Sequence, residues 1–217
     1  MNRRIAVSLE NVAKRYAQHT IFEKINLVID AGECFAVTGR NGSGKSTLLK
    51  IIAGLIRPSS GKVFLTTGDG NKLAPEEISG EFGLVSSDLL FYKMLTGYEN
   101  VTFFAKVTGL NIARERIIEC LRVLELADTQ NEQVATYSTG MRQRLKFALL
   151  LALKPGLWLL DEPFSNLDSS GKKIVDKLIR QALGDQTTII IATNEVREEQ
   201  YATRKLDIAA PGVESFI

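Results

Sequence analysis

The sequence contains few of the residues on which metal and disulfide chemistry depends. Among its 217 residues are two cysteines and one histidine. Cys34 lies in an apolar stretch and Cys120 in an amphipathic one, so we interpret both as reduced core residues rather than as a disulfide pair. His19 falls in a polar turn and is interpreted as incidental. This scarcity excludes a disulfide scaffold and a metal site built from histidine and cysteine.

The sequence also lacks a long apolar run and a strong excess of one charge. The longest apolar run, residues 147–153, stops at Lys154 and Pro155 and is far too short to cross a bilayer. If the protein works at a membrane, we therefore expect another chain to supply the membrane part. The net charge is +2, with 24% charged residues, which gives no electrostatic argument for a nucleic-acid partner.

What the sequence does contain is a glycine-rich loop between a predicted apolar strand, residues 34–38, and a predicted helix, residues 46–55. The loop fits the pattern G-x-x-x-x-G-K-[ST], whose backbone N–H groups turn inward on phosphate groups. We expect Lys45 to reach the β- and γ-phosphates and the hydroxyl of Ser46 to hold Mg²⁺. The expected phosphate-binding residues are Gly39, Asn41, Gly42, Ser43, Gly44, Lys45, Ser46 and Thr47.

The rest of the chain mixes strand and helix patterns. Apolar alternation and short apolar runs predict strands at residues 5–9, 21–29, 62–66, 81–85, 157–160 and 188–192. Helical periodicity predicts helices at residues 99–108, 112–124, 140–153 and 172–182. The order of these elements predicts an α/β protein in which a strand-rich body carries a helical insertion of about 60 residues.

One predicted strand ends in two carboxylates. Residues 157–160 are apolar and lead directly to Asp161 and Glu162. A buried strand at this place delivers Asp161 to the Mg²⁺ side of the phosphates. Glu162, one residue further, is placed to activate a water for in-line attack on the γ-phosphate.

The start of the third predicted helix suits an anion. Ser138 is a good N-cap, and Gly140 permits close backbone approach. The helix N-terminus offers free N–H groups and the positive end of a dipole. A capped helix without a ligand would explain this stretch alone, but its position shortly before Asp161 favours an anion site.

These motifs together resemble the ATP-binding cassette (ABC) ATPase family over essentially the whole chain. Residues 39–47 correspond to Walker A and residues 157–162 to Walker B, with Glu162 as the catalytic glutamate. Residues 138–141 stand where the family has its signature S-G-G-Q, and residues 165–168 match the D-loop. Tyr16 stands where the family places an aromatic side chain that stacks on adenine.

The resemblance implies a fold and a set of partners. The fold is a P-loop NTPase (RecA-like) core, residues 1–94 and 155–217, with an N-terminal antiparallel β subdomain and an inserted α-helical signature subdomain, residues 95–154. The implied cofactors are ATP and Mg²⁺, with Ser46 and Asp161 on the metal. Two such subunits, in a homodimer or heterodimer, close head to tail on two ATP molecules, so that Ser138 and Gly140 of one subunit contact the nucleotide of the other. A separate transmembrane permease subunit would hold the chain, as a cytoplasmic peripheral protein, at the inner face of the cell membrane.

The sequence departs from the family pattern at three places. Ser87 aligns with the glutamine of the Q-loop; we place it at the metal, although its hydroxyl cannot reach both Mg²⁺ and the water as an amide can. Asn194 aligns with the switch histidine, where it can donate to a phosphate oxygen but carries no charge and cannot shuttle a proton. An alternative is that Asn194 is only a loop residue. Thr139 and Met141 replace a glycine and the glutamine of the signature.

Because Lys45, Asp161 and Glu162 are intact, we predict slow but real ATP hydrolysis, with Glu162, Lys45 and Asn194 as catalytic residues. The leading hypothesis is the motor subunit of an ABC transporter, and residues 88–100 resemble the Q-loop region of exporters with ABC-2-type membrane subunits. Two alternatives stay open. One is a soluble ABC ATPase that is not coupled to transport, and the other is a degenerate regulatory subunit that binds ATP in a heterodimer.

Overall fold

The computed structural model describes residues 4–74 and 77–208, which form two compact units. Unit 1 comprises the residues up to Leu84, the segment Pro155–Glu162 and the residues from Ala182 on. Unit 2 comprises Val85–Lys154 and Pro163–Gln181. Among the described residues, no helix has the length and apolar character needed to cross a membrane.

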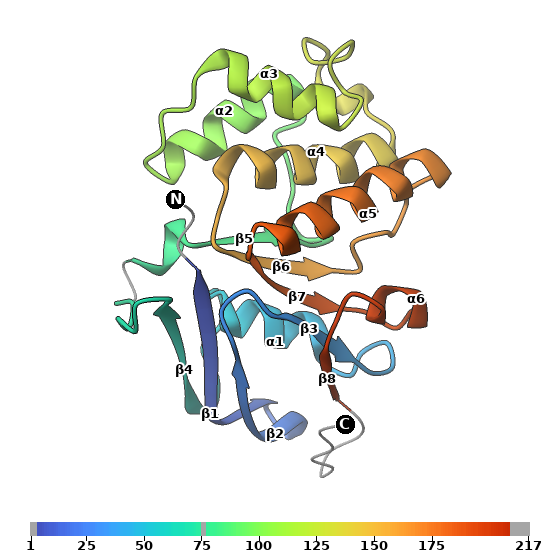
Figure 1. Cartoon of the computed structure of the whole chain (residues 1–217). Helices are drawn as coiled ribbons and strands as arrows, with labels where there is room; N and C mark the ends of the chain where they lie inside the picture. Colours follow the sequence, from blue (N-terminus) through green and yellow to red (C-terminus); the bar gives the residue numbers. More distant parts are fainter. Residues whose placement is uncertain (1–3, 75–76, 209–217) are drawn as a thin grey trace. The chain divides into compact units, whose positions relative to one another are not determined.

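Unit 1 contains two sheets and the helix that follows the glycine-rich loop (Figure 1). Its elements are β1 (Ile5–Tyr16), β2 (His19–Ile29), β3 (Cys34–Thr38), α1 (Lys45–Ile52), β4 (Ser60–Thr67), the 3₁₀ turn η1 (Ile78–Gly80), β5 (Phe82–Val85, whose last residue belongs to unit 2), β6 (Leu157–Asp161), β7 (Thr188–Ala192), α6 (Val196–Glu199) and β8 (Arg204–Asp207).

The first sheet is antiparallel, with the strand order β2-β1-β4. Alternate residues of β1 are buried as far as Leu9, which confirms the predicted alternation. The strand then continues to Tyr16, well past its predicted end, with register shifts between Leu9 and Arg15. These irregularities interrupt the period-2 pattern, which explains why the sequence predicted only the first half of the strand.

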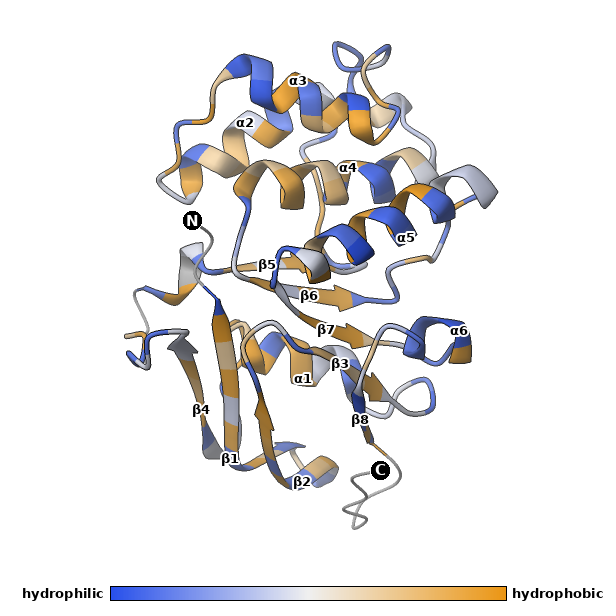
Figure 2. Ribbon diagram, in the orientation of Figure 1, coloured by the Kyte–Doolittle hydropathy of each residue, from blue (hydrophilic) through white to orange (hydrophobic). Residues whose placement is uncertain are grey.

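The second sheet has the order β5-β6-β7-β3-β8. The pairs β3–β7, β3–β8 and β6–β7 are parallel. All five residues of β3 and all five of β7 are buried, and hydrophobic colour dominates both strands in Figure 2. Such continuous apolar runs are typical of parallel strands that are covered on both faces.

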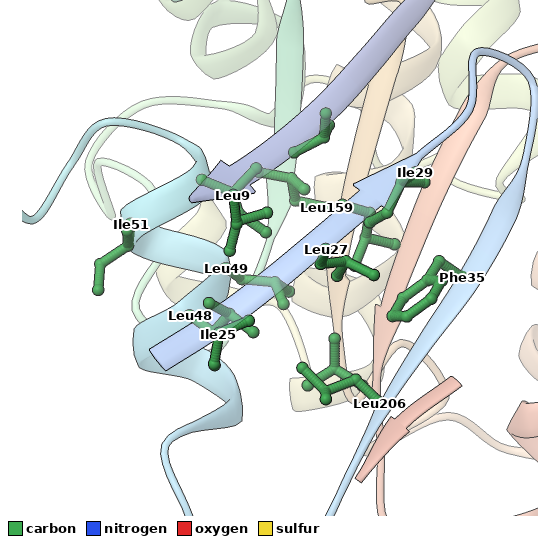
Figure 3. Close-up of a cluster of buried hydrophobic side chains, with 14 of the residues drawn as sticks. Leu9, Ile25, Leu27, Ile29, Phe35, Leu48, Leu49, Ile51, Leu159 and Leu206 are labelled. Carbon is green, nitrogen blue, oxygen red and sulfur yellow. The ribbon is translucent and has the colours of Figure 1, made fainter. Parts of the chain in front are cut away.

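A single apolar core stabilises α1 in unit 1. Leu48, Leu49, Ile51 and Ile52 are each at most 2% exposed and belong to one buried cluster with side chains of both sheets. Figure 3 shows Leu48 and Leu49 in this cluster. Burying a side chain of this size contributes about 1.5–3 kcal/mol. The cluster thus fixes the helix at whose N-terminus the glycine-rich loop ends.

Unit 2 is helical. Its elements are α2 (Gly97–Val107), α3 (Arg114–Val123), the 3₁₀ turn η2 (Val134–Thr136), α4 (Thr139–Leu153) and most of α5 (Ser169–Gly184). The described elements confirm the predicted α/β class with an N-terminal antiparallel sheet and a helical insertion. The sequence did not predict α6 or β8, because each has four residues and no clear periodicity.

Candidate functional site

The backbone of the glycine-rich loop adopts conformations that residues with a side chain would find strained. Gly39, Gly42 and Gly44 have φ values of 141°, 80° and 103°, in the region that L-residues rarely adopt. A Cβ on Gly39 would lie 2.7 Å from the carbonyl oxygen of Ile208, and one on Gly44 would lie 2.3 Å from Cγ2 of Ile21. At these three positions the loop therefore presents backbone rather than side chains.

Helix α1 begins directly after this loop. Its N-cap is Gly44, and the cap has no side-chain hydrogen bond. The N-terminal amides and the positive end of the helix dipole thus face the loop without a competing capping side chain, which suits an anion.

Lys45 is buried, with 6% of its surface exposed. Its Nζ donates to the carbonyl oxygens of Gly39 at 2.8 Å and Arg40 at 3.2 Å. These bonds hold the ammonium inside the curve of the loop, where a phosphate would meet it.

The loop and the end of β6 line one pocket of about 260 Å³. Glu162 is part of its wall, together with Ile21, Asn41, Gly42, Gly44, Lys45, Ser46 and Thr47. Asp161 ends β6 in register with Ala192 of β7, and the N–H of Glu162 donates to the Ala192 carbonyl at 2.9 Å. The parallel sheet thus brings a carboxylate from residue 162 to a loop more than a hundred residues earlier.

Asn194 contacts the same loop from the end of β7. Its Nδ2 donates to Oδ1 of Asn41 at 2.9 Å. Asn194 and Asn41 also line a second pocket, of about 830 Å³, together with residues of β8 such as Lys205 and Asp207. An asparagine there can accept or donate a hydrogen bond but cannot take up a proton.

Tyr16 lies at the end of β1 and is 49% exposed. Nζ of Lys14 stands 4.7 Å from the centroid of its ring. The exposed ring is available for stacking, and its role toward adenine stays a prediction.

The other predicted site residues belong to unit 2. Ser138 caps α4, since its Oγ accepts from the N–H of Met141 at 3.1 Å. A Cβ on Gly140 would lie 3.0 Å from the carbonyl oxygen of Asn166, so the start of α4 is close to the loop after β6. Ser87 is exposed, whereas the preceding Ser86 is buried and its carbonyl accepts from Nζ of Lys146 at 2.6 Å.

The residues of unit 1 fit a nucleotide phosphate chain. The buried Oγ of Ser43 has no hydrogen-bond partner among the described residues. It lies in the loop whose glycines leave space that a Cβ would fill. The ammonium of Lys45 and the uncapped start of α1 supply positive charge, and the hydroxyl of Ser46 and the carboxylate of Asp161 are oxygen ligands of the kind Mg²⁺ prefers.

Sequence reasoning missed two residues of interest. Ile21 lines the pocket and lies where a Cβ added to Gly44 would meet it. An aliphatic residue in a strand carries no signal in the sequence that marks it as part of a site. Gln143 is 5% exposed and its Nε2 donates to the carbonyl oxygen of Pro163 at 3.0 Å. Gln143 stands between Arg142 and Arg144, so no pattern in the sequence distinguishes it as buried.

A strand, a glycine-rich loop and a helix N-terminus, with carboxylates at the end of a parallel strand, define a P-loop nucleotide-binding protein. The family model described as ABC transporter matches residues 22–165. Since this is more than half of the chain, the protein belongs to the ABC transporter family of ATP-binding proteins. The resemblance stated from the motifs is thereby confirmed.

Relatives agree with this assignment. The ABC transporter ATP-binding protein YdbJ of Bacillus subtilis is 35% identical over 191 residues, which cover 88% of this chain and 61% of YdbJ. The bacitracin transport ATP-binding protein BcrA of Enterococcus faecalis is 34% identical over 198 residues, which cover 90% of this chain and 64% of BcrA. The chain thus spans less than two thirds of the length of these two relatives.

A solved structure matches as well. The dimeric post-hydrolysis state of the ATP-binding cassette MJ0796, bound to ADP and Pi, has a TM-score of 0.82 and 29% identity, with 93% of each chain covered. This likeness confirms the predicted P-loop NTPase fold.

Proposed function

We propose that this chain is the ATP-binding and ATP-hydrolysing motor subunit of an ABC transporter, which dimerises on ATP and drives a separate membrane subunit. The observation that carries the proposal is the pocket in which the uncapped start of α1, Lys45 and Glu162 meet. Binding groups for a triphosphate and a carboxylate for a water lie in the same wall, which is what phosphoryl transfer to water requires.

In this proposal each residue has one task. Gly39, residues 41–44 and Thr47 bind phosphate through the loop backbone, and Lys45 binds through its ammonium. Ser46, Asp161 and Ser87 supply oxygen ligands to Mg²⁺, and Tyr16 stacks on the base. Glu162 accepts a proton from the attacking water, and Asn194 hydrogen-bonds a phosphate oxygen. Mg²⁺, when bound, neutralises charge that develops on the phosphates.

We also propose that Ser138 and Gly140 act across a dimer, on the nucleotide of a second subunit. The capped N-terminus of α4 supports this, because it presents backbone N–H groups beside the Ser138 hydroxyl. The dimeric MJ0796 cassette offers a precedent in a related structure. In this arrangement residues 95–154 are the helical signature subdomain and residues 1–94 and 155–217 the core.

A permease subunit is the proposed membrane partner, which makes the chain a peripheral protein at the inner face of the cell membrane. Unit 2 supports this with exposed apolar side chains, since Leu90, Tyr92 and Met94 are 78%, 53% and 71% exposed. The loop that carries Tyr92 and Met94 is held by the buried Asn100, which bonds both the N–H and the carbonyl of Tyr92. A fixed apolar surface of this kind is typical of a protein contact.

The test is ATP turnover and nucleotide titration of the purified chain and two variants. Lys45→Ala should weaken ATP binding, because it removes the buried ammonium. Glu162→Gln should bind ATP normally and accumulate an ATP-bound dimer. Its turnover rate should fall on the order of 10²-fold or more. Unchanged turnover in Glu162→Gln would contradict the assignment of the base, and normal affinity in Lys45→Ala would contradict the role of the loop.

The membrane partner is tested separately, by purification of the chain from its native membranes in mild detergent. A stoichiometric polytopic membrane protein supports the transporter role. Recovery of a soluble dimer alone, or of a ribosome instead of a membrane protein, would support an ABC ATPase that is not coupled to transport.

One observation favours a second candidate, a regulatory subunit that binds ATP in a heterodimer. Asn194, already hydrogen-bonded to Asn41, cannot supply charge or shuttle a proton. ATP binding without measurable turnover of the wild-type chain would support this candidate over the motor.

A further inference from the structure

The turn after β6 holds Glu162 in an unusual backbone conformation. Its φ is 48°, in the left-handed region, where side chains other than glycine, asparagine and aspartate are uncommon. A residue stays in such a conformation only when its surroundings fix it. The structure should therefore contain contacts that keep the backbone of Glu162 in place.

One contact anchors the amino side of this backbone, and the residue that follows works against its conformation. The N–H of Glu162 donates to the carbonyl of Ala192 at 2.9 Å, which anchors its amino side to β7. The next residue is the buried Pro163, whose ring favours an extended conformation in the residue before it, so the left-handed conformation of Glu162 needs contacts that oppose this preference. The direction of the chain beyond Glu162 then depends on what holds Pro163.

Gln143 holds Pro163. It lies in α4, is 5% exposed, and donates from Nε2 to the Pro163 carbonyl at 3.0 Å. Burying a polar side chain costs free energy unless it is hydrogen-bonded, so this bond offsets the burial of the Gln143 amide.

The same helix touches this loop at a second place. Near the N-terminus of α4, the Gly140 backbone is so close to the Asn166 carbonyl that a Cβ would lie 3.0 Å from it. Asn166 also has a positive φ, of 60°. The segment between residues 163 and 166 is thus held against α4 at both ends.

We propose that Gln143 is a positioning residue for the carboxylate of Glu162. By holding the Pro163 carbonyl it keeps Glu162 in its left-handed conformation. This inference rests on the proposed role of Glu162 as the base. A misplacement of about 1 Å at a reacting group costs on the order of 10² in rate, so losing this bond should reduce turnover and leave ATP binding unchanged.

The experiment compares Gln143→Met, which keeps the length of the side chain but removes the donor, with Gln130→Met as a matched control. Gln130 also lies in unit 2, and its buried Oε1 finds no hydrogen-bond partner in the part of the chain that the structure describes. Turnover of Gln143→Met should fall by about 10-fold or more, with ATP affinity within about 2-fold of wild type. Gln130→Met should keep wild-type turnover.

A double-mutant cycle shows whether Gln143 acts through Glu162. In the Glu162→Gln background, Gln143→Met should cause no further loss of the residual single-turnover rate. An equal loss in both backgrounds, or turnover of Gln143→Met within 2-fold of wild type, would overturn the proposal. If Gln143→Met does not fold, Gln143→Leu replaces it, since it also removes the donor and buries no charge.

The two proposals fail in distinguishable ways. If Glu162 is not the base, Glu162→Gln itself retains turnover, and the proposed function fails before the double-mutant cycle is compared. If Glu162 is the base and Gln143 plays only a structural role, Gln143→Met lowers the melting temperature while turnover of the folded fraction stays at the wild-type value, and this result refutes the positioning role.

Discussion

Gly44→Ala is the substitution for which the structure gives the sharpest estimate. Gly44 has a φ of 103°, and an added Cβ would lie 2.3 Å from Cγ2 of Ile21 and 3.1 Å from Cδ1 of Phe22. The left-handed backbone costs an L-residue about 1–2 kcal/mol. Overpacking against the partly buried Ile21, which packs on the core, adds up to about 1–3 kcal/mol. The sum is about 2–5 kcal/mol, a large part of the 5–15 kcal/mol typical of a whole protein.

Two further variants separate the backbone cost from the steric one. Gly42 has a φ of 80°, but no atom of the described residues lies within 4 Å of an added Cβ, so Gly42→Ala should show only the backbone cost, about 1–2 kcal/mol. In an Ile21→Ala background the 2.3 Å contact disappears and only the milder contacts with Phe22 remain, so Gly44→Ala should there cost less than in the wild-type background and approach the cost of Gly42→Ala.

The assay is urea unfolding followed by circular dichroism, with a nucleotide titration on each folded variant. Gly44→Ala should also weaken ATP binding, because relief of the clash moves the loop away from the start of α1. Equal unfolding free energies for Gly44→Ala and Gly42→Ala would refute the steric argument, and an undiminished cost in the Ile21→Ala background would show that Ile21 is not the clashing group.

Two more predictions concern stability. Burial, with a smaller effect from the charge of Glu33, raises the pKa of the Cys34 thiol from 9.0 to about 12, so folding favours the neutral thiol. The buried neutral thiol contributes at most about 4 kcal/mol to the free energy of unfolding, and this contribution is present below pH 9 and lost as the pH rises toward 12. Cys34→Ala should therefore flatten the decline of the unfolding free energy with pH, measured by urea unfolding at alkaline pH. The same decline in the variant and the wild type would argue against this assignment. Thr96 caps α2 in a capping box, with Oγ1 accepting from the N–H of Glu99 at 3.1 Å, so Thr96→Ala should lower the unfolding free energy by about 1 kcal/mol, and no change in the urea midpoint would contradict this.

Much of the fold was predictable because its signals are local. The strand at Cys34–Thr38 and the one at Thr188–Ala192 have the predicted bounds, since each is a continuous apolar run with all residues buried. β8 was not predictable in this way. Only Leu206 of its four residues is buried, and the strand exists because it pairs with the edge of β3.

The candidate site likewise has parts that local sequence predicted and parts that only the fold brings together. The glycine-rich loop and the adjacent pair Asp161 and Glu162 are contiguous in the chain, so spacing alone predicted them. The hydrogen bond between Asn194 and Asn41 joins residues 153 positions apart, and only the parallel pairing of β3 with β7 brings them together.

By itself, then, the sequence determined the phosphate-binding loop, the carboxylate pair and the α/β class, because backbone conformation and apolar periodicity follow from neighbouring residues. Only the tertiary structure decided that Glu162 lines the pocket of the loop, that its backbone is left-handed, and that Gln143 holds the turn after it. The partner of Gln143 is a backbone carbonyl. Every residue has one, so no sequence pattern can identify which carbonyl a buried amide will reach.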